Sequence, residues 1–184
     1  MRVFAAIDLE KKLLDNVKGI QEPLRQTGAD VKFVEPENLH FTVKFLGEVQ
    51  ENALEGIVKA LENSVSGVKA FRISIEGLRY FGSESHIRTL FLDVKENRER
   101  FQGLLNSVDK ALDYVRHERH GARPHLTIGR VKSGRNREAL MEKIRELSPV
   151  KFGEMDVKFM KLKQSLLTKK GPIYSDVKVF ELQD

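Results

Sequence analysis

The feature of this sequence that most restricts its fold is an internal repeat with a spacing of 85 residues. His40-Phe41-Thr42-Val43 matches His125-Leu126-Thr127-Ile128 at that spacing, and without a gap the same spacing aligns Ala6-Ile7-Asp8-Leu9 with Phe91-Leu92-Asp93-Val94. Each copy has an apolar, strand-like run that ends at an aspartate, then a helix-like segment, a His-x-Thr strand and a second helix. A matching order of elements predicts two similar lobes in one fold.

The spacing of apolar residues predicts the individual elements. Runs rich in apolar and β-branched residues predict strands at 2–9 and 87–94, and apolar residues at helical spacing predict helices at about 10–26 and 97–116. Pro23 is expected to bend or end the first of these helices. The other expected elements are His-x-Thr strands at 38–46 and 124–131, helices at 51–66 and 135–147, and strands at 68–81, 151–168 and 172–182.

No linker or low-complexity tract interrupts the chain. We therefore expect residues 1–184 to form a single two-lobed domain, with interdigitated repeat units of roughly 1–85 and 86–184. A pseudo-twofold axis between the two lobes would bring the polar faces of both His-x-Thr strands to one central cleft.

Composition narrows the class of protein. The chain has no cysteine, which excludes disulfides and thiolate zinc sites and suits a reducing cytoplasm. No run of 18 apolar residues occurs, so no membrane span is expected, and the opening residues predict a strand and not a signal peptide. The net charge of +5 fits a polyanionic partner with a phosphate backbone or, equally, a solvated basic surface without a partner.

Alternation along a strand assigns each side chain of the motif to a face. His40 and Thr42 should point to one side, whereas Phe41, Val43 and Phe45 should point to the core of their lobe. By the same parity His125 and Thr127 share a face, and Leu126, Ile128 and Val131 share the opposite one. Each strand would thus offer an imidazole and a hydroxyl to the cleft.

Two facing imidazoles suit acid and base catalysis. Histidine titrates near pH ~6.5, so one neutral ring can take a proton from water while a protonated ring gives one to a leaving oxygen. Threonine hydroxyls can donate to the oxygens of a phosphate held between the rings. No metal site is expected, because each motif offers one good ligand and no spacing typical of a zinc site occurs. The alternative is that the histidines are ordinary strand residues, which a single motif would favour and a repeated one does not.

At these residues the sequence resembles the two-histidine phosphoesterase superfamily and, within it, the LigT-like RNA 2′,3′-cyclic phosphodiesterases, also called 2′-5′ RNA ligases. The resemblance implies an α+β fold with a bilobal pseudo-twofold duplication, in which antiparallel sheets line a central cleft and helices lie outside. The segments that carry the resemblance are Asn38-Leu39-His40-Phe41-Thr42-Val43-Lys44-Phe45-Leu46-Gly47, Arg123-Pro124-His125-Leu126-Thr127-Ile128-Gly129-Arg130 and Arg2-Val3-Phe4-Ala5-Ala6-Ile7-Asp8.

The resemblance also implies roles for single residues. His40 would be the general acid and His125 the general base, while Thr42, Thr127 and Arg130 would bind phosphate oxygens. The activity implied is metal-independent hydrolysis of a 2′,3′-cyclic phosphate at an RNA end to a 2′-phosphomonoester, reversible in some relatives as 2′-5′ ligation. The implied partner is RNA with such an end, fragments of tRNA included, and we expect a cytoplasmic monomer without a cofactor. A non-catalytic module that binds RNA ends is the alternative.

Some residues keep two interpretations. Strict alternation from His125 turns Arg130 away from the cleft, so either a bulge at Gly129 re-aims it or it is a surface charge. Lys44 has the parity to face the cleft, as a phosphate contact or as a rim lysine. Phe81 and Tyr174 are candidates for stacking a terminal base.

Two basic clusters and the remaining histidines are also undecided. Arg116, Arg119 and Arg123 would lie in a loop before the second motif, and a second cluster, nearer the end of the chain, comprises Lys161, Lys163, Lys169 and Lys170. Either cluster could contact RNA phosphates or serve solubility. His117 and His120 belong to the same basic loop and could also contact RNA phosphates, but they and His86 are interpreted as solvated residues.

Overall fold

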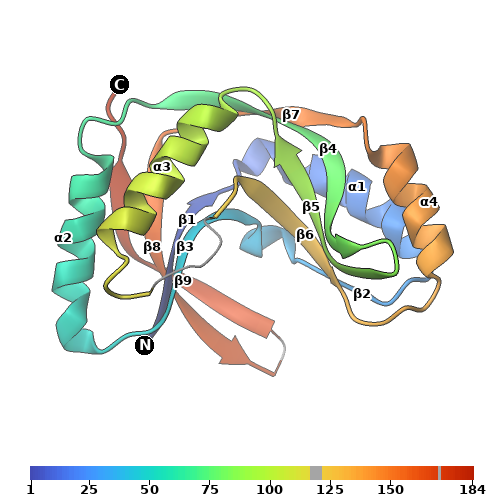
Figure 1. The fold of residues 1–184 in the computed structure, drawn as a ribbon, viewed down its shortest axis with the longest axis horizontal. Helices are drawn as coiled ribbons and strands as arrows, with labels where there is room; N and C mark the ends of the chain where they lie inside the picture. Colours follow the sequence, from blue (N-terminus) through green and yellow to red (C-terminus); the bar gives the residue numbers. More distant parts are fainter. Residues whose placement is uncertain (117–121, 170) are drawn as a thin grey trace.

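The computed structural model describes residues 1–116, 122–169 and 171–184. In these ranges nine strands form one curled antiparallel sheet with the order β7-β4-β5-β6-β3-β1-β8-β9, and β2 pairs with β6 (Figure 1). The strands are β1 (Arg2–Asp8), β2 (Val31–Phe33), β3 (His40–Glu48), β4 (Phe71–Ser83), β5 (His86–Val94), β6 (His125–Val131), β7 (Lys151–Val157), β8 (Phe159–Thr168) and β9 (Gly171–Glu181). The helices are α1 (Leu14–Gln26), α2 (Leu54–Val65), α3 (Arg98–Ala111) and α4 (Arg137–Leu147), with short 3-10 turns at Lys11–Leu13, Pro36–Asn38 and Glu51–Ala53.

The two halves of the sheet meet between the His-x-Thr strands. Phe41 of β3 pairs with Leu126 of β6, and these are the middle residues of the two motifs. Outward from this seam the halves match: Asp8 of β1 lies opposite His40, and Asp93 of β5 lies opposite His125. The repeat seen in the sequence is therefore present in the strand register, and the predicted α+β architecture is confirmed.

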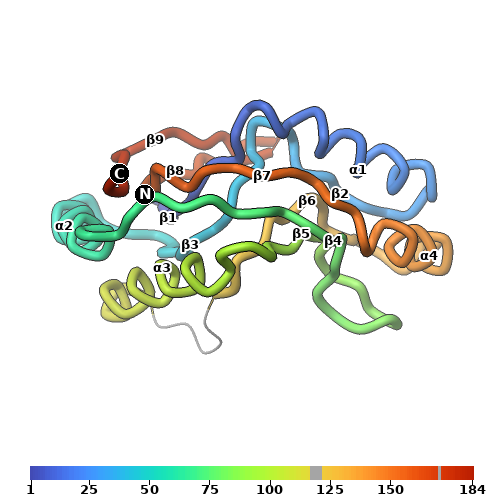
Figure 2. Tube along the Cα trace, turned by 90° about the horizontal axis from the view of Figure 1, so that it is seen from above, coloured from blue at the N-terminus to red at the C-terminus, as the bar shows by residue number. Residues whose placement is uncertain are grey.

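Two helix pairs cover the sheet, and each pair joins helices from both halves of the chain. Asn16 of α1 donates to the carbonyl of Phe152 on β7 (2.9 Å), and Gln21 of α1 donates to that of Ile128 on β6 (3.0 Å). The α3 helix packs on α2, where the Ser107 hydroxyl donates to the Ser64 carbonyl (3.3 Å). Figure 2 shows α2 and α3 at one end of the molecule and α1 and α4 at the other.

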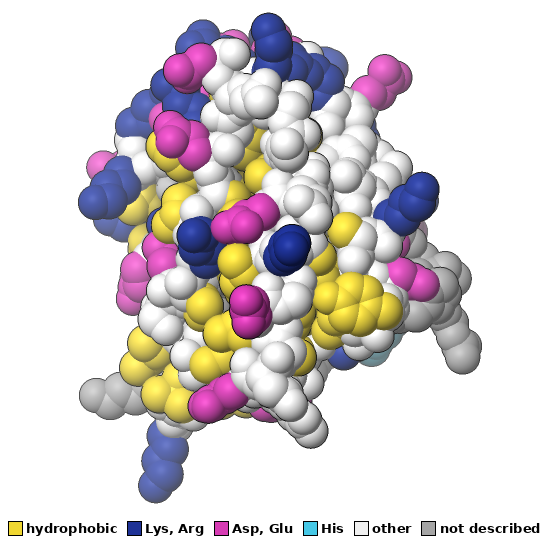
Figure 3. Space-filling model, turned by 90° about the vertical axis from the view of Figure 1, so that its left-hand side faces the viewer, with side chains coloured by type: hydrophobic (Ala, Val, Ile, Leu, Met, Phe, Trp, Pro, Cys, Tyr) yellow, Lys and Arg dark blue, Asp and Glu magenta, His cyan; other side chains and the backbone are white. Residues whose placement is uncertain are grey.

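The core between the sheet and the helices is apolar and continuous. Phe41 packs edge-on against Phe101 of α3 with ring centroids 5.4 Å apart, and Phe101 packs on Phe71 of β4 at 5.9 Å. Among the described residues, no helix is long and apolar enough to span a membrane. The face of the molecule in Figure 3 mixes cationic, anionic and apolar side chains, so the net positive charge is not gathered there.

Several expected elements needed correction. The α1 helix contains Pro23 and continues to Gln26, so Pro23 does not end it. The α3 helix ends at Ala111 and not at 116. The last apolar residues of the helical pattern, Leu112 and Val115, lie in a turn after the helix and pack against the core from there. The segment predicted as one strand over 151–168 is two, since its first half pairs with β4 and its second with β1. The three-residue strand β2 was too short to leave a pattern.

A β-bulge follows each His-x-Thr motif at the same place. In β3, Thr42 pairs with Ala6 and Lys44 with Ala5, which leaves Val43 without a partner. In β6, Thr127 pairs with Phe91 and Gly129 with Leu90, so the extra residue is the equivalent Ile128. Each bulge reverses the alternation of the residues that follow it.

The bulge in β3 corrects two assignments made by strict alternation. The side chain of Lys44 turns to the helix side of the sheet, where it is 1% exposed and forms an ion pair with Asp109 of α3. It therefore does not face the histidines. Phe45, assigned to the core, is half-buried on the other side, with the guanidinium groups of Arg2 and Arg116 over its ring at 4.9 and 5.2 Å.

Candidate active site

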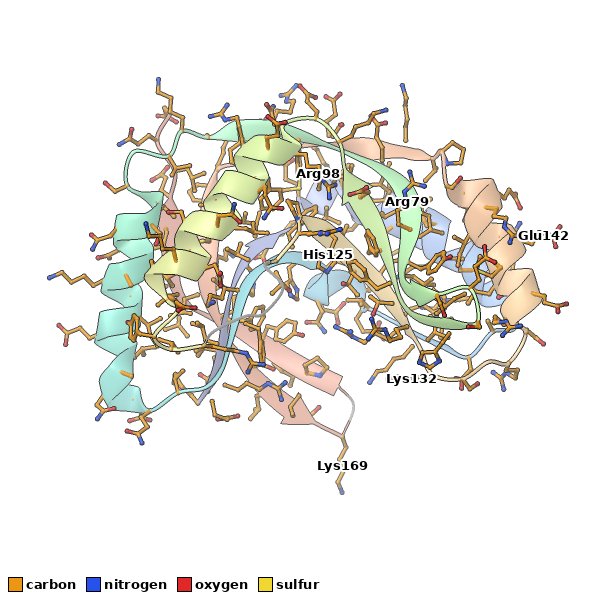
Figure 4. The ribbon with its side chains drawn as sticks, viewed as in Figure 1. Arg79, Arg98, His125, Lys132, Glu142 and Lys169 are labelled. Carbon is orange, nitrogen blue, oxygen red and sulfur yellow. The ribbon has the colours of Figure 1, made fainter. Side chains whose placement is uncertain are left out.

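Both motifs lie on one face of the sheet, which we call the histidine face and define by His40, Thr42, His125 and Thr127. Directly opposite residues of paired strands share a face, and the Phe41–Leu126 pair is buried on the helix side. The four motif residues are half-buried on the reverse side. Figure 4 shows His125 near the middle of the molecule. The sheet therefore brings together the two histidines that the sequence singled out.

Hydrogen bonds fix the tautomer of each imidazole. Nδ1 of His40 donates to the carbonyl of Asn38 (2.7 Å), and Nδ1 of His125 donates to that of Arg123 (2.6 Å). A carbonyl oxygen can only accept, so both Nδ1 atoms carry the proton. Nε2 is then the nitrogen left for chemistry in both rings, and in His40 it lies 3.1 Å from the hydroxyl of Thr42.

Aromatic side chains surround both rings. Phe4 and Tyr174 lie beside His40 with centroid distances of 5.0 and 5.5 Å, and Tyr174 meets the ring edge-on. Phe81 meets His125 edge-on at 5.1 Å. The two aromatic residues predicted to stack a base are thus next to the catalytic candidates, one in each half. Phe4 was not singled out in the sequence, because an apolar residue in a first strand carries no sign of this role.

Burial lowers the pKa of both histidines below the ordinary value of 6.5. For His40, the charges of Lys163 and His125 add to this lowering, so the two rings lie within electrostatic reach of each other. The neighbouring charges differ between the rings. The strongest charge acting on His40 is Asp8, which raises its pKa, whereas the strongest acting on His125 is Arg130, which lowers it further. The largest charge effect thus favours the protonated form of His40 and the neutral form of His125.

Asp8 belongs to a cluster of two carboxylates and two ammonium groups beside His40. Lys163 donates to Asp8 (2.7 Å), and Lys161 bonds both Asp8 (2.8 Å) and Asp176 of β9 (2.7 Å). Burial alone would raise the pKa of Asp8, but the hydrogen bonds from the two lysines bring it below its usual value. Lys161 and Lys163, which the sequence grouped in a basic cluster, are therefore both paired with carboxylates.

Arg130 reaches the histidine face because of the bulge at Ile128. It pairs with Thr89 of β5 after the register shift. Its positive charge acts on the pKa of His125 and also opposes the effect of burial on the pKa of Tyr174, which belongs to the other half of the sheet. Arg130 therefore lies on the side of the sheet that carries the histidines, and its contact with phosphate stays a prediction. The extra residue is Ile128, one position before Gly129, where the bulge was predicted.

The carboxylate of Asp93 occupies the place beside His125 that Asp8 occupies beside His40. It accepts a hydrogen bond from the guanidinium of Arg98, at the start of α3, and one from the backbone N–H of Val94 (2.9 Å). Sequence reasoning noted both aspartates as ends of the repeated strands and gave them no role. Each aspartate precedes the histidine of its own repeat by the same number of residues, and this equal spacing was the signal that could have identified the two aspartates.

The other candidates are spread over the molecule. The side chains of Arg123 and His86 are exposed, and Lys169 lies at the end of the β8–β9 hairpin, away from His125 (Figure 4). No group of three or more histidine, aspartate or glutamate side chains in the described ranges is placed to hold a metal ion. Four of the residues considered in the sequence lie outside the described residues: His117, Arg119, His120 and Lys170.

Known proteins are similar in sequence to this chain over nearly its full length. The family model described as the 2′-5′ RNA ligase superfamily matches residues 14–164. The RNA 2′,3′-cyclic phosphodiesterase of Methanothermobacter thermautotrophicus is 46% identical over 99% of this chain and 99% of that protein. The protein of the same name from Archaeoglobus fulgidus is 41% identical over 98% and 100%.

Solved structures share the fold. The protein TT0787 of Thermus thermophilus superposes with a TM-score of 0.82 at 26% identity and covers 100% of this chain and 98% of its own. The apo form of E. coli LigT gives a TM-score of 0.79 at 19% identity, with the same coverage, and supports the fold alone. From the family match and the extent of these similarities, the chain belongs to the 2′-5′ RNA ligase superfamily.

Proposed function

We propose that this chain is an RNA 2′,3′-cyclic phosphodiesterase that opens a terminal cyclic phosphate to a 2′-phosphomonoester without a metal ion. The relatives that are 41% and 46% identical over nearly the whole chain carry that name. The observation that carries the proposal is the pair of imidazoles on one sheet face, each with its Nδ1 proton tied to a backbone carbonyl and its Nε2 left for proton transfer.

The charges around the rings support a division of roles. Nε2 of His125 takes a proton from water as the water oxygen bonds to phosphorus, and Nε2 of His40 gives its proton to the 3′ oxygen as the P–O3′ bond breaks. Asp8 favours the charged form of His40 and Arg130 favours the neutral form of His125. A bound phosphate anion raises both pKa values, which restores the proton that burial removes from His40.

Hydroxyl and guanidinium groups complete the phosphate site in this proposal. The hydroxyls of Thr42 and Thr127 donate to non-bridging oxygens, and Arg130 adds a charge-assisted contact. Thr42 already lies within hydrogen-bonding distance of His40 Nε2. When phosphate binds, a phosphate oxygen takes the place of Nε2 as the partner of the Thr42 hydroxyl. These donors stabilise the charge that builds up on the phosphate oxygens during attack.

The same site accounts for ligation. If a 5′ hydroxyl of RNA replaces water, His125 takes the proton of that hydroxyl and His40 again protonates the 3′ oxygen, so a 2′-5′ linkage forms. The two histidines exchange roles when such a linkage is cleaved back to the cyclic phosphate. The substrate is RNA that ends in a 2′,3′-cyclic phosphate, such as a tRNA fragment. Because both motifs come from one chain, the site is complete in a monomer.

Hydrolysis of nucleoside 2′,3′-cyclic phosphates in excess EDTA tests the proposal, with the phosphate position of the product read by phosphorus NMR. The expected product is the 2′-phosphate. His40→Ala and His125→Ala are each expected to lower the rate by about 10³-fold or more, and the exposed His86→Ala serves as the matched control. Binding of a cyclic-phosphate RNA end without any product would favour the non-catalytic module instead.

A further inference from the structure

An open cavity of about 530 Å³ lies next to the part of the histidine face that carries His125. Residues of β4, β5 and β7 line it, together with the start of α3 and the segment that follows α4. Its charged lining comprises four cations and two carboxylates, which are Arg79, Lys95, Arg98, Lys151, Glu76 and Asp93.

The register of the strands connects this cavity to His125. Asp93 lies opposite His125, Glu76 lies opposite Asp93, and Lys151 lies opposite Glu76. Residues paired in this way point to the same side of a sheet, so the row runs along the histidine face from β6 to the edge strand β7. At about 4.8 Å between strands, Lys151 is about 14 Å from β6.

Ion pairs leave part of the positive charge in the cavity available. Asp93 is bonded to Arg98, and Glu76 is paired with Lys95 (3.3 Å). Within the described ranges no carboxylate is paired with Arg79 or Lys151, and both side chains are exposed. Figure 4 shows Arg79 and Arg98 in the same region as His125. The cavity therefore presents two free cations beside a reaction centre for phosphate chemistry.

We propose that this cavity binds backbone phosphates of a single-stranded RNA whose cyclic end lies between the two histidines. The inference rests on the proposed function and adds to it the path of the strand. Phosphates of the nucleotides before the terminal one lie along the row from β6 to β7, where Arg79 and Lys151 contact them. A nucleoside cyclic phosphate has no such phosphates and gains nothing from the cavity.

The test compares kcat/KM for a short oligoribonucleotide with a 2′,3′-cyclic end and for a nucleoside 2′,3′-cyclic phosphate. Arg79→Gln and Lys151→Gln are each expected to lower the ratio of the two values about five- to tenfold. Each should also reduce the salt slope of log kcat/KM for the oligonucleotide by about 0.7. Lys59→Gln on α2, an exposed lysine far from the cavity, is the matched control.

An unchanged ratio and an unchanged salt slope in both variants would overturn the inference, as would equal losses on the two substrates. Failure of the proposed function gives a different result, because the wild-type protein would then hydrolyse neither substrate. In that case, fluorescence anisotropy of the labelled oligonucleotide decides the matter. Weaker and less salt-dependent binding by Arg79→Gln supports the cavity, and wild-type binding by both variants rejects it.

Discussion

The ion pair between Lys44 and Asp109 offers a sharp test of the bulge in β3. We expect Asp109→Asn to lower the free energy of unfolding by about 2–3 kcal/mol. The bulge places the Lys44 ammonium at 1% exposure, whereas the Asp109 carboxylate is 30% exposed. Breaking a buried pair costs about 3–5 kcal/mol, because one charge is left uncompensated. Partial exposure of the carboxylate reduces that figure.

Thermal or urea unfolding measures the effect. At about 2–4 °C per kcal/mol for a chain of this size, Tm should fall by roughly 5–10 °C. Lys44→Met removes the charge that needs a partner and is expected to cost less than about 1.5 kcal/mol. In the Lys44→Met background, Asp109→Asn should have almost no further effect.

The control is Asp15→Asn, which removes an exposed ion pair with Lys18 on α1 and should leave Tm unchanged. If Asp109→Asn unfolds at the wild-type temperature, or costs the same with and without the lysine charge, then Lys44 is not held on the helix side by this pair. The account of the bulge would then be wrong.

Three further predictions concern the site. Because the pKa of both histidines lies below 6.5, kcat/KM of the free enzyme should peak below about pH 6.5. The rate should fall at higher pH because His40 loses its proton, and at lower pH because His125 gains one. A peak above about pH 7.5 contradicts this prediction. Asp8→Asn removes the carboxylate that raises the pKa of His40, so the alkaline limb of the profile should move to lower pH, and a limb that stays in place would exclude this role. Arg130→Gln removes the cation that lowers the pKa of His125, so the acidic limb should move to higher pH while KM rises about tenfold; an unchanged KM would separate Arg130 from the phosphate.

The sequence was sufficient to locate the two histidines and the order of the elements around them. This succeeded because the repeat compares the chain with itself. Equal spacing of a polar pair in two apolar strands indicated one shared face, and the pairing of Phe41 with Leu126 confirms it. The match between Asp8 and Asp93 was visible for the same reason, although its consequence for the histidines was not.

The sidedness of residues beyond the motifs could not be predicted. An extra residue such as Val43 or Ile128 is apolar, like its neighbours, so a bulge leaves no mark on the pattern. Whether Lys44 and Arg130 face the site depends on that residue alone. Charge pairing was equally hidden, because Lys163 meets Asp8 only after the chain has folded across 155 positions.

The central claim is that His40 and His125 act on one phosphate as a pair. Single-turnover rates on an RNA end with a 2′,3′-cyclic phosphate, measured in EDTA for each alanine variant and for the double variant, test it most directly. Residues that work as a unit are strongly non-additive, so the double variant should be about as slow as the slower single variant. If the two losses multiply, or if either single variant keeps the wild-type rate, the two imidazoles do not share a reaction.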